Sequence, residues 1–405
     1  MRFAFRAAAL AAAATAALAT PASAKTIKVG LIAPFSGPAS IYGEDWAAAI
    51  QVFQKLYGDS VDGNKVEIIK RDIPGPDPLK VRALAQELVV KEGVQYLAGL
   101  VYSPNALALG AFANQAKVPI VIFNAATSSI IDKSQYFLRT SYTLPQISAP
   151  EAIYALNKGY KKMVSMVSDY APGWDAEKTF VDTFEKNGGK VVAKIRVPLS
   201  TTDFVPYLQR AKAADPDAIF GFMPGGGPTF ELLTAYNNSG MRGKIPYLGQ
   251  GETNEVYLPK YGDGVVGLTT VFFYSAAHRS AENDAFKKAL HEIDPKAVDN
   301  NYFACAMDGM HVIYAMIHAT HGEKDGDKAI AAAKGLKWES IRGAVSIDPK
   351  TRDFIQPVEV REVEKDPKTG ALYNKEIEVF PAQPDYGRPG TPLPTVASLK
   401  PVILK

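Results

Sequence analysis

The stretch from Tyr96 to Thr127, YLAGLVYSPNALALGAFANQAKVPIVIFNAAT, decides the predicted fold. Two short apolar runs, 96–100 and 119–123, flank a segment whose apolar and small residues recur at helical spacing. Buried apolar strands that alternate with helices are typical of a parallel sheet. In open α/β sheets, ligands bind in the crevice beyond the carboxyl ends of the strands. The sequence therefore predicts a ligand site where these two strands end.

A hydroxyl residue follows each of the two strands. Ser103 precedes Pro104 in a cap-and-first-turn arrangement, and Thr127 with Ser128 opens the segment after the second strand. A helix N-terminus offers unpaired N–H groups and partial positive charge, which suit an anion. Two such ends side by side could hold one carboxylate through hydroxyl and main-chain donors. The alternative is that Ser103 and Thr127 merely cap their own helices.

Residues 1–24 have the composition of a secretory signal peptide. Two arginines precede an Ala/Leu-rich stretch, and Ala22-Ser23-Ala24 forms a small-residue cleavage site. A membrane anchor is the alternative, but the apolar stretch 10–19 is too short to span a bilayer. We expect cleavage after Ala24 and an exported mature chain of roughly 380 residues, a length that predicts two domains.

The composition argues against nucleic acid as a partner and against disulfide bonds. Lysine and arginine number 45 against 42 acidic residues, and the basic residues are dispersed, so nothing favours nucleic acid. The single cysteine, Cys305, cannot form an internal disulfide, so the fold must depend on core packing. Its apolar helical surroundings, 302–307, indicate a buried, inert thiol.

Alternating strands and helices continue on both sides of the opening stretch. One series runs from Ile27 to Ser141 and a second from Met163 to Gly249, with Thr140–Pro145 as a possible crossing point between two lobes. The remaining third is less regular, with helices followed by short strands. The proline-rich tail, 381–405, is expected to extend over the surface. The predicted architecture is α/β with two similar lobes.

Several segments occur along the chain in the order that is typical of one protein family. They are IKVGLIAPFSGPASIYG, LAGLVYSPNA, VPIVIFNAATS, VSDYAPGWDAEKTF and GDGVVG. From Thr26 to about Phe380 the chain resembles the periplasmic solute-binding proteins of the leucine/isoleucine/valine type, which feed ABC importers. Through VQYLAGL, NAATSSI, LSTTDF and RGAVSIDPKTR it is most similar to the branch that takes up aromatic acids.

The resemblance implies the type I periplasmic binding protein fold, in which two doubly wound parallel-sheet lobes, joined by three crossovers, close on a ligand. The implied crossovers lie near Ser141–Pro145, Phe273–Ala276 and Ser346–Arg352. The implied boundaries are 25–143 plus 275–347 for lobe 1, 144–274 plus 348–380 for lobe 2, and 381–405 for the tail. It also implies a periplasmic monomer that binds a small-molecule carboxylate and presents it to a membrane permease.

The resemblance further implies which residues contact the ligand. Family positions match Tyr42 as an aromatic wall and Tyr170 in the second lobe. At the ligand carboxylate they match the turn Tyr102–Asn105 together with Ala125 and Thr127. The full expected set is Tyr42, Tyr102, Ser103, Asn105, Asn124, Ala125, Thr127, Tyr170, Trp174, Met223, Gly225, Gly251 and Glu252. This chain has Pro172-Gly173 where the family often has Tyr-Gly, so a usual hydroxyl is missing. Asn105 could instead satisfy its own helical turn, and Trp174 could pack within its helix.

The glycine-rich segment 222–229, FMPGGGPT, is not a phosphate loop. It lacks the Gly-Lys-Ser/Thr ending of such loops and has no basic residue. A glycine turn that lets a ligand approach the main chain near Met223 and Gly225 is the preferred interpretation.

Gly251 and Glu252 discriminate between ligand classes. Amino-acid-binding relatives place an acidic side chain near this point to pair with the ligand's ammonium, and here Gly251 aligns best with that position. If Glu252 points away from the cleft, a buried ammonium would lack its counter-charge, at a cost of several kcal/mol. A ligand without an ammonium would then be preferred.

No catalytic or metal motif accompanies these residues. The five histidines form no HExxH motif, no carboxylate stands at a zinc-ligand spacing, and GxSxG is absent. We therefore expect no enzyme, no cofactor and no metal. The favoured function is the binding component of an ABC importer for a small aromatic carboxylate of the benzoate, hydroxybenzoate or phenylpropenoate type. The alternatives are a branched-chain or aromatic amino acid as ligand, an exported α/β enzyme, and a ligand-sensing protein.

Overall fold

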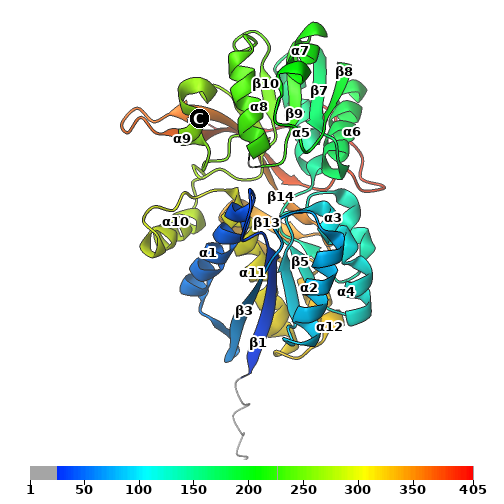
Figure 1. The fold of residues 1–405 in the computed structure, drawn as a ribbon, viewed down its shortest axis with the longest axis vertical. Helices are drawn as coiled ribbons and strands as arrows, with labels where there is room; N and C mark the ends of the chain where they lie inside the picture. The colour runs from blue at the N-terminus through cyan, green and yellow to red at the C-terminus, as the bar shows by residue number, and fades with distance from the viewer. Residues whose placement is uncertain (1–24, 226, 405) are drawn as a thin grey trace, which may run out of the picture.

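Two lobes lie one above the other in the computed structural model, and several chain segments pass between them (Figure 1). The structure describes residues 25–225 and 227–404, so the expected signal peptide, 1–24, lies outside the described residues. Within the described residues, no helix is both long enough and apolar enough to cross a membrane.

Lobe 1 is built on a six-stranded sheet with the order β2-β3-β1-β4-β5-β6. Its strands are β1 (Thr26–Ala33), β2 (Ser60–Val61), β3 (Asn64–Asp72), β4 (Tyr96–Gly99), β5 (Ile120–Ile122) and β6 (Phe137–Arg139). The short β2 pairs antiparallel with β3, and the other neighbours are parallel. The opening stretch supplies the adjacent strands β4 and β5. The residues that follow them therefore lie at one edge of the sheet, as predicted.

The helical segment between β4 and β5 is broken in two. It consists of α3 (Ser103–Ala108) and α4 (Gly110–Ala116). Gly110, the first residue of α4, packs closely on the 3-10 helix η1 (Ser128–Lys133), because a Cβ there would lie 2.6 Å from the Cβ of Lys133 and 2.8 Å from its carbonyl oxygen. The other helices of lobe 1 are α1 (Ser40–Tyr57), α2 (Pro78–Val90), the 3-10 helix η1 (Ser128–Lys133), α10 (Ala281–Ile293), α11 (Asn301–Thr320) and α12 (Gly326–Ala333).

Lobe 2 contains a larger, mixed sheet. Its parallel strands are β7 (Lys162–Ser168), β8 (Lys190–Val197), β9 (Ala218–Phe222), β10 (Tyr247–Gly249) and β11 (Thr269–Phe272). The antiparallel strands that extend this sheet beyond β11 are β12 (Lys337–Ser340), β13 (Gly343–Ile347), β14 (Phe354–Lys365) and β15 (Leu372–Gln383). The helices are α5 (Leu144–Asn157), α6 (Ala171–Lys186), α7 (Val205–Ala213), α8 (Gly227–Asn238), α9 (Leu258–Tyr261) and the 3-10 helix η2 (Gly262–Val265). The two-lobed α/β fold is confirmed, with an antiparallel edge added to the expected parallel sheet.

One buried guanidinium contacts all three segments that pass between the lobes. Arg342 donates hydrogen bonds to the carbonyl oxygen of Thr140 and to Oε1 of Gln356, each at 2.6 Å. Its guanidinium carbon lies 4.8 Å from the centre of the Phe273 ring. The charge of Arg342 is paired with Asp308 of α11 at 2.6 Å, and both side chains are buried. Residues in or near the three expected crossovers therefore meet at a single ion pair.

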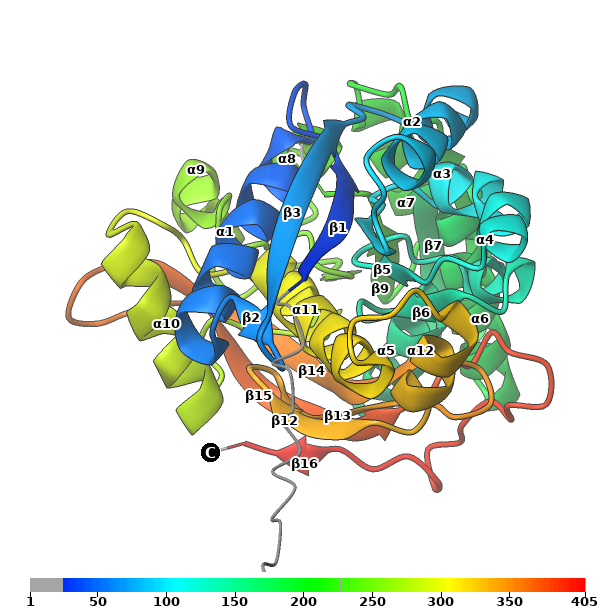
Figure 2. The ribbon, with the colours of Figure 1, turned by 90° about the horizontal axis from the view of Figure 1, so that it is seen from below.

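The proline-rich tail after β15 contacts both lobes. Asp385 accepts a hydrogen bond from the Ser128 hydroxyl of lobe 1 at 2.9 Å. Farther along, the N–H of Val396 donates to Asn187 at the end of α6 in lobe 2, at 3.0 Å. The final strand, β16 (Val402–Ile403), then pairs with β15. The tail thus runs along the outside of the molecule and is attached at several points (Figure 2).

Replacing Arg342 tests the importance of the buried ion pair. Arg342→Met leaves the buried Asp308 carboxylate without its partner, and losing one member of a buried pair costs about 3–5 kcal/mol of unfolding free energy. Urea unfolding followed by tryptophan fluorescence measures this loss. Lys117→Met is the control, because it removes only the exposed pair between Lys117 and Asp327 and should change little. Equal effects of the two substitutions would contradict the prediction.

Candidate ligand-binding site

The lobes meet around a cavity at the carboxyl ends of their parallel strands. Lobe 1 contributes residues that follow β1, β4 and β5, and lobe 2 contributes residues at or beyond the ends of β7 and β9. The lining residues are Tyr42, Val101, Tyr102, Ser103, Asn124, Ala126, Tyr142, Tyr170, Pro172, Phe222, Pro224 and Gly225. This edge is the one at which the opening stretch predicted a ligand site.

Six residues of the expected set line this cavity. They are Tyr42, Tyr102, Ser103, Asn124, Tyr170 and Gly225. The other seven lie around or beyond it: Asn105, Ala125, Thr127, Trp174, Met223, Gly251 and Glu252. Asn105 binds the loop before α2, since its amide donates to the Gly75 carbonyl at 3.0 Å and accepts from the Asp77 N–H at 2.8 Å.

The polar groups of lobe 1 are joined to one another. The Ser103 hydroxyl accepts a hydrogen bond from the main-chain N–H of Thr127 at 3.3 Å. The amide of Asn124 donates to the Val101 carbonyl at 3.0 Å. Thr127 makes no side-chain capping hydrogen bond to η1, so the capping alternative is wrong for this residue. The hydrogen bond of the Ser103 hydroxyl goes to Thr127 and not to α3, and Ser103 lines the cavity.

Tyrosines form the walls of the cavity. The Tyr42 ring lies 4.0 Å from the Tyr302 ring, and Tyr142 stacks on Phe273 with ring centres 4.8 Å apart. In lobe 2, Tyr170 is nearly parallel to the Phe222 ring at 6.3 Å. Burial raises the pKa of the hydroxyls of Tyr42, Tyr142 and Tyr170. These hydroxyls therefore stay protonated and can donate hydrogen bonds to a ligand.

The main chain of lobe 2 touches lobe 1 at Gly225. A Cβ at this position would lie 2.7 Å from the Tyr302 hydroxyl and 2.9 Å from the Tyr42 hydroxyl, so no side chain fits there. Trp174 lies elsewhere: its side chain is 46% exposed and its indole N–H donates to Asp169 at 2.7 Å. The structure is thus a closed arrangement of the lobes, and Trp174 is outside the cavity.

Thr127 holds a carboxylate, but one that belongs to the protein. Its hydroxyl donates to Oδ2 of Asp175 at 2.6 Å, and the Ser128 N–H donates to the same oxygen at 3.1 Å. Asp175 lies on α6 of lobe 2, so this contact, which we call the interlobe latch, joins the two lobes. Burial raises the pKa of the Asp175 carboxyl, and the hydrogen bond from Thr127 opposes that rise. The loop after β5 therefore binds an anion, as its sequence indicated.

Arg139 binds the main chain of the loop after β5. Its guanidinium donates to the carbonyl oxygens of Ala125 at 3.1 Å and Thr127 at 2.9 Å. The same side chain is fully buried and pairs with Asp353 at 2.9 Å. The carbonyl oxygens of Ala125 and Thr127 are therefore already engaged by a protein donor. Arg139 lies on β6 and belongs to none of the sequence motifs, so it was not predicted from the sequence.

Glu252 is buried within lobe 2 and is not among the residues that line the cavity. Its Oε1 accepts hydrogen bonds from the Met223 N–H at 3.1 Å and the Tyr247 hydroxyl at 3.2 Å, and its Oε2 has no hydrogen-bond partner among the described residues. Burial raises the pKa of this carboxyl to about 7. Gly251 has a φ of +91°, and a Cβ there would lie 2.9 Å from the Phe272 ring, so this position requires glycine. The acidic side chain that could pair with an ammonium therefore does not line the cavity.

The cavity is narrow and carries no charge on its described lining residues. About 420 Å³ is free of atoms, but only about 30 Å³ is wide enough for the centre of a water molecule. Such a space holds little more than water. An aromatic ligand therefore requires the lobes or the tyrosine side chains to move apart.

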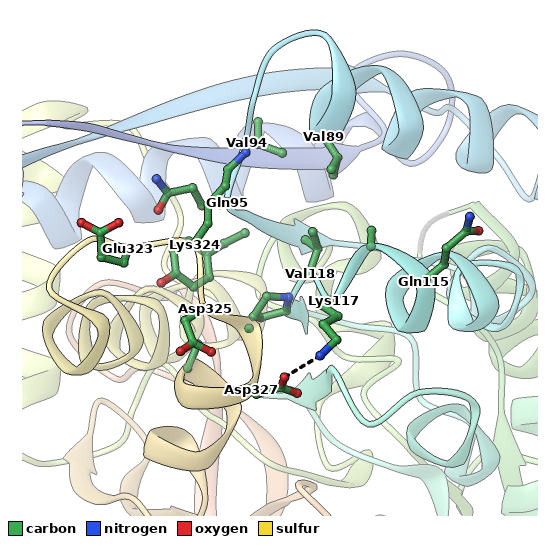
Figure 3. A pocket seen from close by; sticks show the side chains of 15 residues that line it. Val89, Val94, Gln95, Gln115, Lys117, Val118, Glu323, Lys324, Asp325 and Asp327 are labelled. Atoms are coloured by element: carbon green, nitrogen blue, oxygen red, sulfur yellow. Dashed lines mark hydrogen bonds and ion pairs between the residues drawn. The ribbon is translucent and has the colours of Figure 1, made fainter.

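A larger cavity, of about 450 Å³, lies at the amino ends of β4 and β5 (Figure 3). It is bordered by exposed charged residues, and Lys117 pairs with Asp327 at its edge at 2.9 Å. Ligands of open α/β sheets bind at the opposite, carboxyl ends of the strands. The larger cavity is thus a polar surface depression remote from the closing lobes.

Several lining residues were missed from the sequence. They are Val101, Ala126, Tyr142, Pro172, Phe222 and Pro224. Five of them lie next to, or two positions from, an expected residue, which is the only signal that could have found them. Tyr142 differs, because it lies in the segment predicted as a crossing point, and a crossover between lobes necessarily runs along the cleft.

Comparison with known proteins identifies the family. A family model described as periplasmic binding protein matches residues 26–370. The Leu/Ile/Val-binding protein homolog 6 of Brucella abortus (strain 2308) is 46% identical over 369 residues, which cover 90% of this chain and 94% of that protein.

Solved structures show the same relation. The solute binding protein of an ABC transporter from Rhodopseudomonas palustris HaA2, in complex with p-hydroxybenzoic acid, is 46% identical, has a TM-score of 0.87 and is matched over 90% of this chain and 100% of that one. The corresponding protein from Rhodopseudomonas palustris BisB5, in complex with 3,4-dihydroxybenzoic acid, is 41% identical, has a TM-score of 0.84 and is matched over 89% and 99%. The fold is therefore shared along nearly the whole length of each chain.

The chain belongs to the periplasmic binding protein family, as its motifs indicated. This is a family of substrate-binding transport proteins, which are not enzymes. The names of the relatives divide between two ligand classes, branched-chain amino acids and hydroxylated benzoic acids.

Glu252 should make folding stability depend on pH. Its pKa is raised from 4.5 to about 7 in the folded protein, so its contribution to stability is present below about pH 4.5 and is lost as pH rises through about 7. Relative to Glu252→Gln, the wild type should lose about 2–3 kcal/mol between about pH 5 and pH 8. Urea unfolding at several pH values measures the difference. Glu231→Gln, at an exposed position, is the control, and a pH-independent difference for Glu252→Gln would contradict the prediction.

Proposed function

We propose that the protein is the periplasmic binding component of an ABC importer and that it binds a small aromatic carboxylate of the benzoate or hydroxybenzoate type. The observation that carries the proposal is the composition of the cavity lining. Four tyrosines, one serine and one asparagine surround it: Tyr42, Tyr102, Tyr142, Tyr170, Ser103 and Asn124. Flat, stiff aromatic side chains suit a planar ring, and their hydroxyls suit the polar groups at its ends. The relatives that contain hydroxylated benzoic acids support the proposal.

A branched-chain amino acid is the second candidate, because relatives carry that name. Its ammonium would need a carboxylate in the cavity. Glu252 is bound to Met223 and Tyr247 within lobe 2, and Asp175 is held by Thr127. Neither carboxylate lines the cavity, and burying an ammonium without a partner is costly. The geometry therefore favours a ligand without an ammonium.

Closure is the proposed mechanism of binding. The ligand enters between separated lobes, and rotation about the crossovers then forms the interlobe latch, with the tyrosine side chains displaced far enough to make room for the ring. A ligand that binds between the lobes stabilises the closed form by its differential affinity for that form. The closed form is then the shape that a permease would recognise.

A thermal-shift screen of the mature protein tests the ligand class. One panel contains benzoate, 4-hydroxybenzoate, 3,4-dihydroxybenzoate and cinnamate, and the other contains leucine, isoleucine, valine and phenylalanine. A ligand that binds only the folded protein raises the melting temperature. We expect shifts from the first panel only. Shifts from the second panel only would contradict the aromatic-acid proposal and favour the amino-acid alternative.

Substitutions at the interlobe latch test the closure mechanism. Thr127→Ala and Asp175→Ala should each weaken binding of 4-hydroxybenzoate by about 1–3 kcal/mol, because each removes the same charge-assisted hydrogen bond. The double variant should lose no more than either single variant, since the two residues act as a pair. Isothermal titration calorimetry measures the affinities.

Asp182→Ala is the matched control, because Asp182 is on the same helix and pairs only with Lys178 at the surface. If Asp175→Ala tightens binding instead, Thr127 has been freed to hold the ligand carboxylate itself. That outcome would contradict the latch and return Thr127 to the role that the family resemblance implied.

A further inference from the structure

Three potential metal-ligating side chains from distant parts of the sequence meet at the second crossover. His278 lies in the segment between β11 and α10, Glu359 lies on β14, and Glu376 lies on β15. One nitrogen or oxygen atom from each can be chosen so that all three lie within 4.8 Å of one another. The Nδ1 atom of His278 is 3.0 Å from Glu376 Oε1 and 3.9 Å from Glu359 Oε1.

The carboxylate of Glu359 has no partner in this cluster that explains its burial. Its side chain is 1% exposed, and neither of its oxygens accepts a hydrogen bond from the described residues. Burial and the neighbouring Glu376 raise the pKa of this carboxyl. A buried carboxylate without a hydrogen bond is costly, and two adjacent carboxylates repel unless a proton or a cation lies between them.

The positive charge of Arg361 acts on Glu359, but the hydrogen bonds of its guanidinium go to other acceptors. Arg361, two residues after Glu359, donates to the Tyr274 carbonyl at 2.6 Å and to the Thr270 hydroxyl at 3.0 Å. It also lies 3.9 Å from Glu255. Arg361 therefore lowers the negative potential around Glu359 but supplies no hydrogen bond to it.

We propose that His278, Glu359 and Glu376 form a binding site for a divalent transition-metal ion, with Zn²⁺ as the ion that fits the ligands best. One imidazole nitrogen and two carboxylate oxygens are a ligand set that zinc accepts, at bond lengths of about 2.0–2.2 Å. Tetrahedral bonds of that length separate ligand atoms by roughly 3.4 Å. The observed separations of 3.0 Å and 3.9 Å bracket this value.

The chemistry and the exposure of the three side chains also indicate which class of metal ion the site would bind. Calcium and magnesium prefer sites made entirely of oxygen atoms, whereas imidazole favours zinc and its neighbours in the first transition row. The side chains of His278 and Glu376 are 19% and 10% exposed, so an ion can reach the site from solvent and keep a water molecule as a further ligand. A bound ion would link the segment that contains His278 to strands β14 and β15.

Calorimetric titration of Zn²⁺ into the tag-free, chelator-treated mature protein tests the site. We expect one Zn²⁺ per chain and a rise in melting temperature on binding. His278→Ala and Glu376→Gln should each lose this stoichiometric binding. His291→Ala should keep it, because His291 is an exposed histidine that lies 3.9 Å from Asp299 and serves as a matched control.

Failure of the wild type to bind stoichiometric Zn²⁺ would overturn the proposal and would indicate a proton shared between the two glutamates. Unchanged binding by His278→Ala would overturn it as well, as would an equal rise in melting temperature with Ca²⁺. If His278→Ala does not fold, X-ray absorption of the wild type loaded with Co²⁺ decides the question. A spectrum with imidazole nitrogen and carboxylate oxygen around the ion supports the site, and a spectrum with oxygen ligands only overturns it.

Discussion

The relation between the two lobes depends on the buried pair of Arg342 and Asp308. A guanidinium is planar and carries five donors, so it can bind several acceptors at once and stack on rings at the same time. Arg342 uses all of these properties, since it lies between the rings of Phe273 and Phe354 at 4.8 Å and 4.7 Å. These contacts join residues in or next to all three expected crossovers, so they hold the crossovers close together at one buried point.

The opening stretch was sufficient to predict a parallel sheet and one wall of the site. Its two buried strands specify adjacent parallel neighbours, and the residues after them must lie at one edge of the sheet. Tyr102, Ser103 and Asn124 line the cavity for this reason. The type I fold followed from motif order, and the antiparallel strands β14 and β15 added an edge that strand–helix alternation does not encode.

The rest of the site could not be predicted, because it depends on contacts between distant segments. Asp175 and Thr127 lie on different lobes, so their contact depends on how the lobes meet, and Glu252 is bound by Met223 and Tyr247 in the core of lobe 2. The cluster around Glu359 was missed for a similar reason. Metal motifs are recognised by short spacings along one element, whereas this cluster forms where a crossover passes two strands of a sheet.

The tail gives the molecule a further connection that three crossovers alone do not provide. After β15 in lobe 2 the chain returns to lobe 1 at Asp385 and then goes back to lobe 2 at Val396. The peptide between these two attachments has a fixed contour length, so it limits how far the two lobes can separate while both attachments hold. Wider separation would require at least one of these hydrogen bonds to break. A segment without helices or long strands thus adds to the free energy needed to separate the lobes.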